Sequence, residues 1–137
     1  MIVVSACLAG IKCNYLGDDN SHPQVVELVR KGVAIPICPE QLGGLPTPRI
    51  PAEIQDKKVI NKNGDDVTHN FQKGAKEALR IVKLTKCKKA ILKSNSPSCG
   101  LEKIYDGSFS GKLIHGMGIT SELFIKNGIK IITEKDL

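Results

Sequence analysis

The sequence predicts a single α/β domain built on a four-stranded parallel sheet, and three observations lead to this fold class. Short apolar runs rich in Ile and Val alternate with amphipathic segments of helical period along the chain. The length of 137 residues is ordinary for one domain with one core. No repeat, low-complexity tract or interdomain linker interrupts the alternation. We therefore assign residues 1–137 to one three-layer, Rossmann-like domain.

The first part of the chain predicts two strands joined by a helix. Met1–Ala6 is an apolar run too short for a helix, so we expect a buried strand. Pro23–Lys31 places its apolar residues on one helical face, with Ser21 as a candidate cap and Gly32 closing the helix. Val33–Ile37 then predicts a second strand.

The middle of the chain predicts a loop, a small hairpin and a long helix. Gly and Pro are so dense in Cys38–Arg49 that we expect no regular element there. Lys57–Ile60 and the Asn63-Gly64 pair indicate a hairpin or turn. Thr68 is a candidate cap for a long amphipathic helix that runs to Lys86.

The last part predicts two more strands around a second excursion. Lys89–Leu92 is the third strand, and Tyr105–Leu113, with two Gly-containing turns, indicates a hairpin-like excursion. Thr120–Asn127 predicts a short helix that Gly128 stops, and Ile129–Thr133 predicts the fourth strand. Strands that alternate with helices form right-handed crossovers and a parallel sheet covered on both faces, for which we expect the order 2-1-3-4.

Three of the five cysteines lie at or in the loop after the end of a predicted strand. Cys7, Cys38 and Cys99 belong to different strands, but the carboxyl ends of parallel strands meet at one edge, where doubly wound sheets bind ligands. Cys87 precedes the third strand, so we expect it at the opposite edge in a structural role. Cys13 lies in the loop after the first strand, as an extra ligand, a thiol near the pocket or an incidental loop cysteine.

Thiols in this arrangement favour a soft metal centre. The sequence gives no signal for export, so we expect a cytoplasmic protein without structural disulfides. Zinc prefers four ligands at short paired spacings such as C-x-x-C, which the sequence lacks. Three cysteines on separate loops suit a [4Fe-4S] cluster with one open iron, while buried apolar cysteines without any metal are the alternative.

Polar residues flank these cysteines. The hydroxyls of Ser96 and Ser98 and a run of backbone amides precede Cys99, where they could donate hydrogen bonds to cluster sulfur or to an anion. Glu40, two residues after Cys38, could transfer protons in a reaction at the open iron or be a solvated loop carboxylate.

The charged residues have both structural and functional interpretations. Arg49 and Lys93 could hold an anionic group of a substrate or form surface salt bridges. The net charge is +6, but no aromatic residues interleave with the clustered lysines, so we do not expect nucleic acid as a partner. The first apolar stretch is too short to span a membrane, and no nucleotide-binding glycine loop is present.

Several motifs spread over nearly the whole chain carry a family resemblance. They are Ser5-Ala6-Cys7-Leu8-Ala9-Gly10, Pro36-Ile37-Cys38-Pro39-Glu40, Gly43-Gly44-Leu45-Pro46-Thr47-Pro48-Arg49, Asp66-Val67-Thr68, Phe71, Gly74-Ala75, Ser96-Pro97-Ser98-Cys99-Gly100-Leu101 and Tyr105-Asp106-Gly107-Ser108-Phe109. In this combination the chain resembles the bacterial family once labelled domain of unknown function five-two-three, which includes the thiouracil desulfidases.

The resemblance implies an enzyme with an iron-sulfur cofactor. Thiouracil desulfidases remove sulfur from thionated nucleobases without net redox change, using a [4Fe-4S] cluster held by three cysteines. The match assigns these ligands to Cys7, Cys38 and Cys99, and the polar catalytic position to Ser96. The open iron would bind the sulfur of the substrate as a Lewis acid, while water attacks the carbon and hydrosulfide leaves. We expect such a cluster to be lost from samples prepared in air.

Three functional hypotheses follow. The leading one is a [4Fe-4S]-dependent desulfidase acting on a thiolated small molecule such as 2-thiouracil or another thionucleobase. Its site consists of catalytic Ser96 and Glu40 and substrate-binding Ser98, Arg49 and Lys93. The second hypothesis is sulfur transfer in nucleic-acid thiolation, which salt-sensitive RNA binding would favour. The third is a structural or redox-sensing cysteine or metal module, which predicts no turnover.

Overall fold

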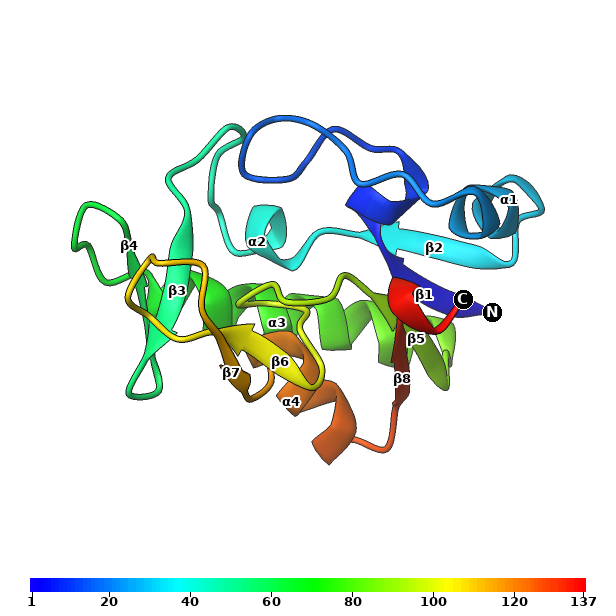
Figure 1. The fold of residues 1–137 in the computed structure, drawn as a ribbon. Coiled ribbons are helices and arrows are strands. Elements are labelled where there is room, and N and C mark those ends of the chain that lie inside the picture. Colours follow the sequence, from blue (N-terminus) through cyan, green and yellow to red (C-terminus); the bar gives the residue numbers. More distant parts are fainter.

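A four-stranded parallel sheet forms the centre of the computed structural model, which describes residues 1–137 (Figure 1). The elements in chain order are β1 (Ile2–Ser5), η1 (Ala6–Ala9), α1 (Pro23–Arg30), β2 (Ala34–Ile37), α2 (Pro39–Leu42), β3 (Ala52–Gln55), β4 (Lys58–Asn61), α3 (Thr68–Thr85), β5 (Lys89–Leu92), β6 (Lys103–Tyr105), β7 (Leu113–His115), α4 (Ile119–Lys126), β8 (Lys130–Thr133) and η2 (Glu134–Asp136). The sheet order is β2-β1-β5-β8, which confirms the predicted order 2-1-3-4.

Helices cover both faces of the sheet, because successive side chains of a strand point to opposite faces. Val3 of β1 joins the core cluster that contains Val82 of α3 and Phe124 of α4. The next residue, Val4, joins the cluster that contains Val25 of α1. The predicted three-layer arrangement is therefore confirmed. No helix of the chain has the length and apolar character needed to cross a membrane.

Two antiparallel hairpins, β3–β4 and β6–β7, lie outside the parallel sheet. Figure 1 shows them side by side, and β3 and β6 are in contact. The first hairpin reverses at Asp56 and Lys57, both at positive φ, and the Asn63-Gly64 pair forms a separate turn after β4. The predicted hairpin or turn at Lys57–Ile60 and Asn63-Gly64 is therefore confirmed, and two non-Gly residues in the left-handed conformation form the reversal of the hairpin itself.

The segment Cys38–Arg49 contains the short helix α2, which the sequence analysis did not expect. Pro39 stands at the first helical position, where proline costs no hydrogen bond. Tertiary packing stabilises this helix, since a Cβ on Gly43 would collide with the backbone of α3, and a Cβ on Gly74 would collide with the carbonyl of Pro39. The two glycines let α2 approach α3 closely, and this approach fixes the position of Cys38.

Two predicted helix caps are also wrong. The N-cap of α1 is His22, not Ser21, and its Nδ1 accepts a hydrogen bond from the Gln24 amide at 3.3 Å. Thr68 is the first residue of α3 and not its cap. Its hydroxyl accepts a hydrogen bond from the Val59 amide at 2.8 Å, so Thr68 joins α3 to β4.

Candidate functional site

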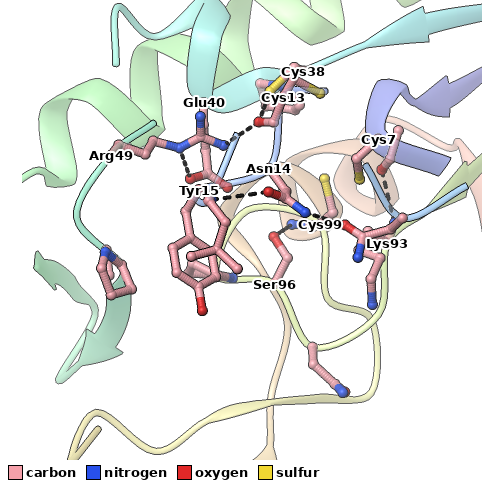
Figure 2. A pocket seen from close by; sticks show the side chains of 18 of the residues that line it. Cys7, Cys13, Asn14, Tyr15, Cys38, Glu40, Arg49, Lys93, Ser96 and Cys99 are labelled. Carbon is pink, nitrogen blue, oxygen red and sulfur yellow. Dashed lines mark hydrogen bonds and ion pairs between the residues drawn. The ribbon is translucent and has the colours of Figure 1, made fainter. Parts of the chain in front are cut away.

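A cavity of about 610 Å³ opens at the carboxyl edge of the parallel sheet. Four of the five cysteines line it, namely Cys7, Cys13, Cys38 and Cys99 (Figure 2). Cys87 lies in the core at the other edge of the sheet, with its sulfur 3.1 Å from the Thr85 hydroxyl. The three cysteines predicted to meet at this edge therefore line one cavity, and Cys87 lies apart from them, as predicted.

Each of the three predicted ligands stands where a strand ends. Cys7 follows β1 as part of the turn η1, and Cys38 stands between β2 and α2. Cys99 lies in the loop after β5, and α4 holds this loop in place. The amides of Ile119 and Thr120, both in the first turn of α4, donate hydrogen bonds at 2.9 Å to carbonyls within this loop. Cys99 is therefore held in position by α4 as well as by the strand that precedes its loop.

The two serines near Cys99 have different surroundings. Ser96 lines the cavity, and its Oγ accepts hydrogen bonds from the amides of Ser98 at 3.1 Å and Cys99 at 3.0 Å. Ser98 is 1% exposed and does not line the cavity, and its hydroxyl lies 3.1 Å from the Thr120 hydroxyl. The structure therefore gives Ser98 a packing role in place of the predicted contact with substrate.

The thiols around the cavity influence one another electrostatically. Burial, together with the neighbouring thiols of Cys99 and Cys38, raises the pKa of Cys7 to about 12. Burial likewise raises the pKa of Cys99 to about 11. A hydrogen bond from the Cys13 thiol to the Cys38 sulfur lowers the pKa of Cys38 and raises that of Cys13. The loop cysteine Cys13 is therefore a direct neighbour of a predicted ligand.

Arg49 is buried against the cavity wall, with only 6% of its side chain exposed. Its Nε donates to Glu40 at 2.9 Å, and its Nη2 donates to the Cys13 carbonyl at 2.8 Å (Figure 2). Its Nη1 donates to the Pro46 carbonyl and the Thr47 hydroxyl. All three guanidinium nitrogens have protein partners, so Arg49 holds Glu40 and the Cys13 loop in position. Of the two predicted uses of Arg49, the structure shows a salt bridge, and it is buried and not on the surface.

Lys93 lines the cavity and pairs with Glu134, whose role the sequence analysis missed. The Lys93 ammonium lies 3.2 Å from one carboxylate oxygen, and Ser94 donates to both oxygens through its amide at 2.7 Å and its hydroxyl at 2.9 Å. Burial opposes ionisation of Glu134, but the Ser94 and Lys93 contacts outweigh it and lower the pKa of the carboxyl. The position of Glu134 in the sequence could have indicated its role. It comes directly after the fourth strand, which ends at the same edge of the sheet as the strands before the cysteines.

The donor set of the cavity fits an iron-sulfur cluster. Cysteines line it and no histidine does, and soft thiolates are the usual ligands of such clusters. No three His, Cys, Asp or Glu side chains converge in the way that a single metal ion requires. Cys7, Cys38 and Cys99 are the residues that would hold the cluster, each from a different loop.

Comparisons with known proteins give consistent matches over the whole chain. A family model described as 2-thiouracil desulfurase matches residues 2–136. The uncharacterized protein YbbK of Bacillus subtilis (strain 168) is 42% identical over 147 residues, which cover 100% of this chain and 97% of YbbK. A solved structure described as the [4Fe-4S]-dependent thiouracil desulfidase TudS (DUF523Vcz) matches with a TM-score of 0.95 and 41% identity, covering 99% of this chain and 91% of the other.

Proposed function

The chain belongs to the 2-thiouracil desulfurase family, and we propose that it removes sulfur from a thiolated small molecule, such as 2-thiouracil or another thionucleobase, with a [4Fe-4S] cluster and without net redox change. Membership confirms the resemblance drawn from the motifs. The observation that carries the proposal is one cavity that combines Cys7, Cys38 and Cys99 with Glu40 and Ser96.

In this proposal Cys7, Cys38 and Cys99 hold the cluster. When bound, the cluster supplies a Lewis-acidic iron for the sulfur of the substrate. Thiols must lose their protons to act as ligands, and the pKa values of Cys7 and Cys99 are raised to about 12 and about 11. Cluster loading therefore releases protons from this site.

Glu40 is placed to accept a proton from water. One of its carboxylate oxygens receives the Arg49 hydrogen bond at 2.9 Å, and the other has no protein partner. The free oxygen can accept a proton from the water that attacks the thiocarbonyl carbon. In the net reaction a C–O bond forms and the C–S bond breaks. The sulfur leaves as hydrosulfide with one proton of the water, and the other proton goes to the carboxylate.

Ser96 and Lys93 stabilise the charge that develops during this reaction. Because two backbone amides already donate to the Ser96 oxygen, its own hydroxyl proton is available for a group in the cavity. The Lys93 ammonium lies in the same wall, where a fixed positive charge favours the developing anion. Both groups are held in place before the substrate arrives, since Glu134 and the loop amides orient them.

Anaerobic reconstitution with iron and sulfide tests the proposal. We expect about four irons per chain and conversion of 2-thiouracil to uracil with an equal amount of released hydrosulfide. Cys99→Ala should abolish both, whereas Cys87→Ala, the control at the other edge of the sheet, should keep both. Absence of bound iron from every anaerobic preparation would contradict the proposal and favour a structural cysteine module. A stable cluster without turnover on any thionucleobase would favour redox sensing.

Substitution of Glu40 tests the proton transfer separately from cluster binding. Glu40→Gln should leave the iron content unchanged and lower kcat roughly 100-fold or more, as expected for loss of a general base. Glu77→Gln is the matched control, because Glu77 forms an exposed ion pair on α3. Equal kcat for Glu40→Gln and the wild type would remove Glu40 from the reaction.

A further inference from the structure

The few aromatic residues of this protein are divided between the core and the cavity. The chain has five aromatic residues, of which Phe71 and Phe124 are buried in the core. The other three, Tyr15, Tyr105 and Phe109, line the cavity. Tyr105 and Phe109 belong to the motif Tyr105–Phe109, to which the proposed chemistry assigns no task.

Phe109 has an unusual backbone conformation. Its φ is +57°, a region that L-residues with bulky side chains rarely adopt because the Cβ crowds the backbone. Such conformations persist only where surrounding contacts impose them, and they concentrate at ligand sites. Phe109 lines the cavity, so the unfavourable conformation occurs at a position where a ring can contact a ligand.

Contacts from β3 impose this conformation. The carboxylate of Glu53, which is 9% exposed, accepts hydrogen bonds from the amides of Gly107 at 3.0 Å and Phe109 at 3.1 Å. Gln55 donates to the Gly107 carbonyl at 2.6 Å. A Cβ on Gly107 would collide with the Ile54 carbonyl, so only glycine allows this approach. Figure 1 shows the loop between β6 and β7 lying beside β3.

The buried carboxylate of Glu53 holds the loop between β6 and β7 by accepting hydrogen bonds from two backbone amides of that loop. Glu53 accepts no hydrogen bond from any side chain, so its observed contacts serve to hold the loop. The cost of desolvating a carboxylate is offset only when such hydrogen bonds form. The result is a loop whose aromatic side chain is fixed before any ligand binds, which reduces the entropy lost on binding.

We propose that Phe109 binds the face of the planar ring of the substrate, and that Glu53 is its positioning residue. The inference rests on the proposed function, because a thionucleobase is the planar ligand in question. Ring faces stack on aromatic side chains whatever the substituents at the ring edge. Phe109 thus selects for a flat ring, while the reacting C–S group faces the cysteines.

Steady-state desulfuration of 2-thiouracil by the reconstituted holoenzyme tests the role of Phe109. Phe109→Leu keeps an apolar side chain but removes the ring, and it should raise KM about 10-fold with kcat changed less than about 2-fold. Phe109→Tyr keeps the ring and should restore KM to near the wild-type value. Ile114→Ala is the control, since Ile114 is exposed on the same hairpin and does not line the cavity. A wild-type KM for a folded Phe109→Leu enzyme would overturn the inference.

The positioning role of Glu53 has its own pair of variants. Glu53→Leu removes the acceptor and should raise KM to a similar extent as Phe109→Leu. Glu53→Gln keeps one acceptor oxygen and should recover most of the wild-type KM. Thermal unfolding of each variant shows whether the fold is intact. If Glu53→Leu folds and keeps the wild-type KM, Glu53 has no positioning role.

Equilibrium dialysis of 2-thiouracil against the same proteins separates this inference from the proposed function. Lack of turnover by the wild type would refute the proposed function only. In that case weaker binding of 2-thiouracil by Phe109→Leu than by wild type and Phe109→Tyr would still support the inference. Equal binding by all three proteins, or no binding by the wild type, would overturn it.

Discussion

Cys99 and Cys87 are nearly equally buried, with 5% and 2% of their surface exposed, yet they lie in different chemical surroundings. Cys99 lies at the carboxyl edge of the sheet, where it lines the cavity and its amide donates a hydrogen bond to the Ser96 hydroxyl. Cys87 stands at the amino edge, packed among core residues such as Val82 and Ala90. The burial of a cysteine therefore does not reveal its role. The edge of a parallel sheet at which it lies is more informative.

The two edges differ because of how they are built. At the amino edge, Cys87 lies just after the end of α3 and belongs to the hydrophobic core, with the Thr85 hydroxyl 3.1 Å from its sulfur. At the carboxyl edge, three loops converge, and polar side chains from distant segments hold them. Convergent loops leave a cavity that a ligand can fill, whereas a helix end packed on a strand does not.

The same substitution at both edges should produce the largest difference. Cys38→Ser removes one of the three proposed cluster ligands, so iron content should fall and desulfuration should drop at least roughly 100-fold, more than is usual when only a residue that orients a ligand is changed. Cys87→Ser should keep both and lower only the free energy of unfolding, because it places a hydroxyl in the core. Iron analysis, activity and urea unfolding measure these effects. Similar iron loss in both variants would refute the distinction between the edges.

A smaller effect is expected from Arg49, the cation that organises the carboxyl edge. Lysine keeps the charge but cannot reproduce four hydrogen bonds from a planar guanidinium, so Arg49→Lys should lower kcat roughly 10-fold with most of the iron retained. Arg80→Lys is the matched control, because Arg80 is 75% exposed and forms a surface ion pair. If both variants keep the wild-type kcat, the buried guanidinium contributes nothing to the geometry of Glu40.

The smallest expected effect concerns Glu134, which ties the end of β8 to the loop after β5. The pKa of Glu134 in the folded protein lies below its ordinary value of 4.5, so its ionised form stabilises the fold above that pH. At pH 7 the metal-free Glu134→Gln variant should be less stable than wild type by about 1 kcal/mol. This difference should disappear as the pH falls through the folded pKa of Glu134.

Urea unfolding at several pH values measures this difference. Glu122→Gln, which breaks an exposed i,i+4 pair on α4, should show little difference at any pH and serves as the control. A stability difference for Glu134→Gln that persists unchanged at low pH would contradict the assignment of Glu134 as a stabilising anion.

The sequence alone determined the main architecture and the edge of the sheet at which the proposed ligand cysteines lie. The hydrophobic period of a strand or helix depends only on neighbouring residues, so the four sheet strands were predicted correctly. Their order was predicted from the alternation of strands and helices and is also correct. Because parallel strands end at a common edge, the order also predicted that Cys7, Cys38 and Cys99 share a cavity and that Cys87 does not. The family motifs then indicated the chemistry of that cavity.

Only the tertiary structure decided the polar partners around these cysteines. Arg49 meets the Cys13 carbonyl across 36 positions of sequence, and Ser94 meets Glu134 across 40. No local pattern encodes such pairs, since they depend on which loops the sheet brings together. The same holds for α2, which forms because Gly74 of α3 leaves room for its backbone.

The contrast between Ser96 and Ser98 summarises the division between sequence and structure. Both serines were predicted to contact the substrate, but Ser96 lines the cavity and Ser98 lies against Thr120 of α4. In the same way, the position of Phe109 at positive φ follows from the Glu53 carboxylate, which is 56 residues away. Local propensity predicts most of the helices and strands, whereas long-range packing determines α2 and decides which side chains line the cavity.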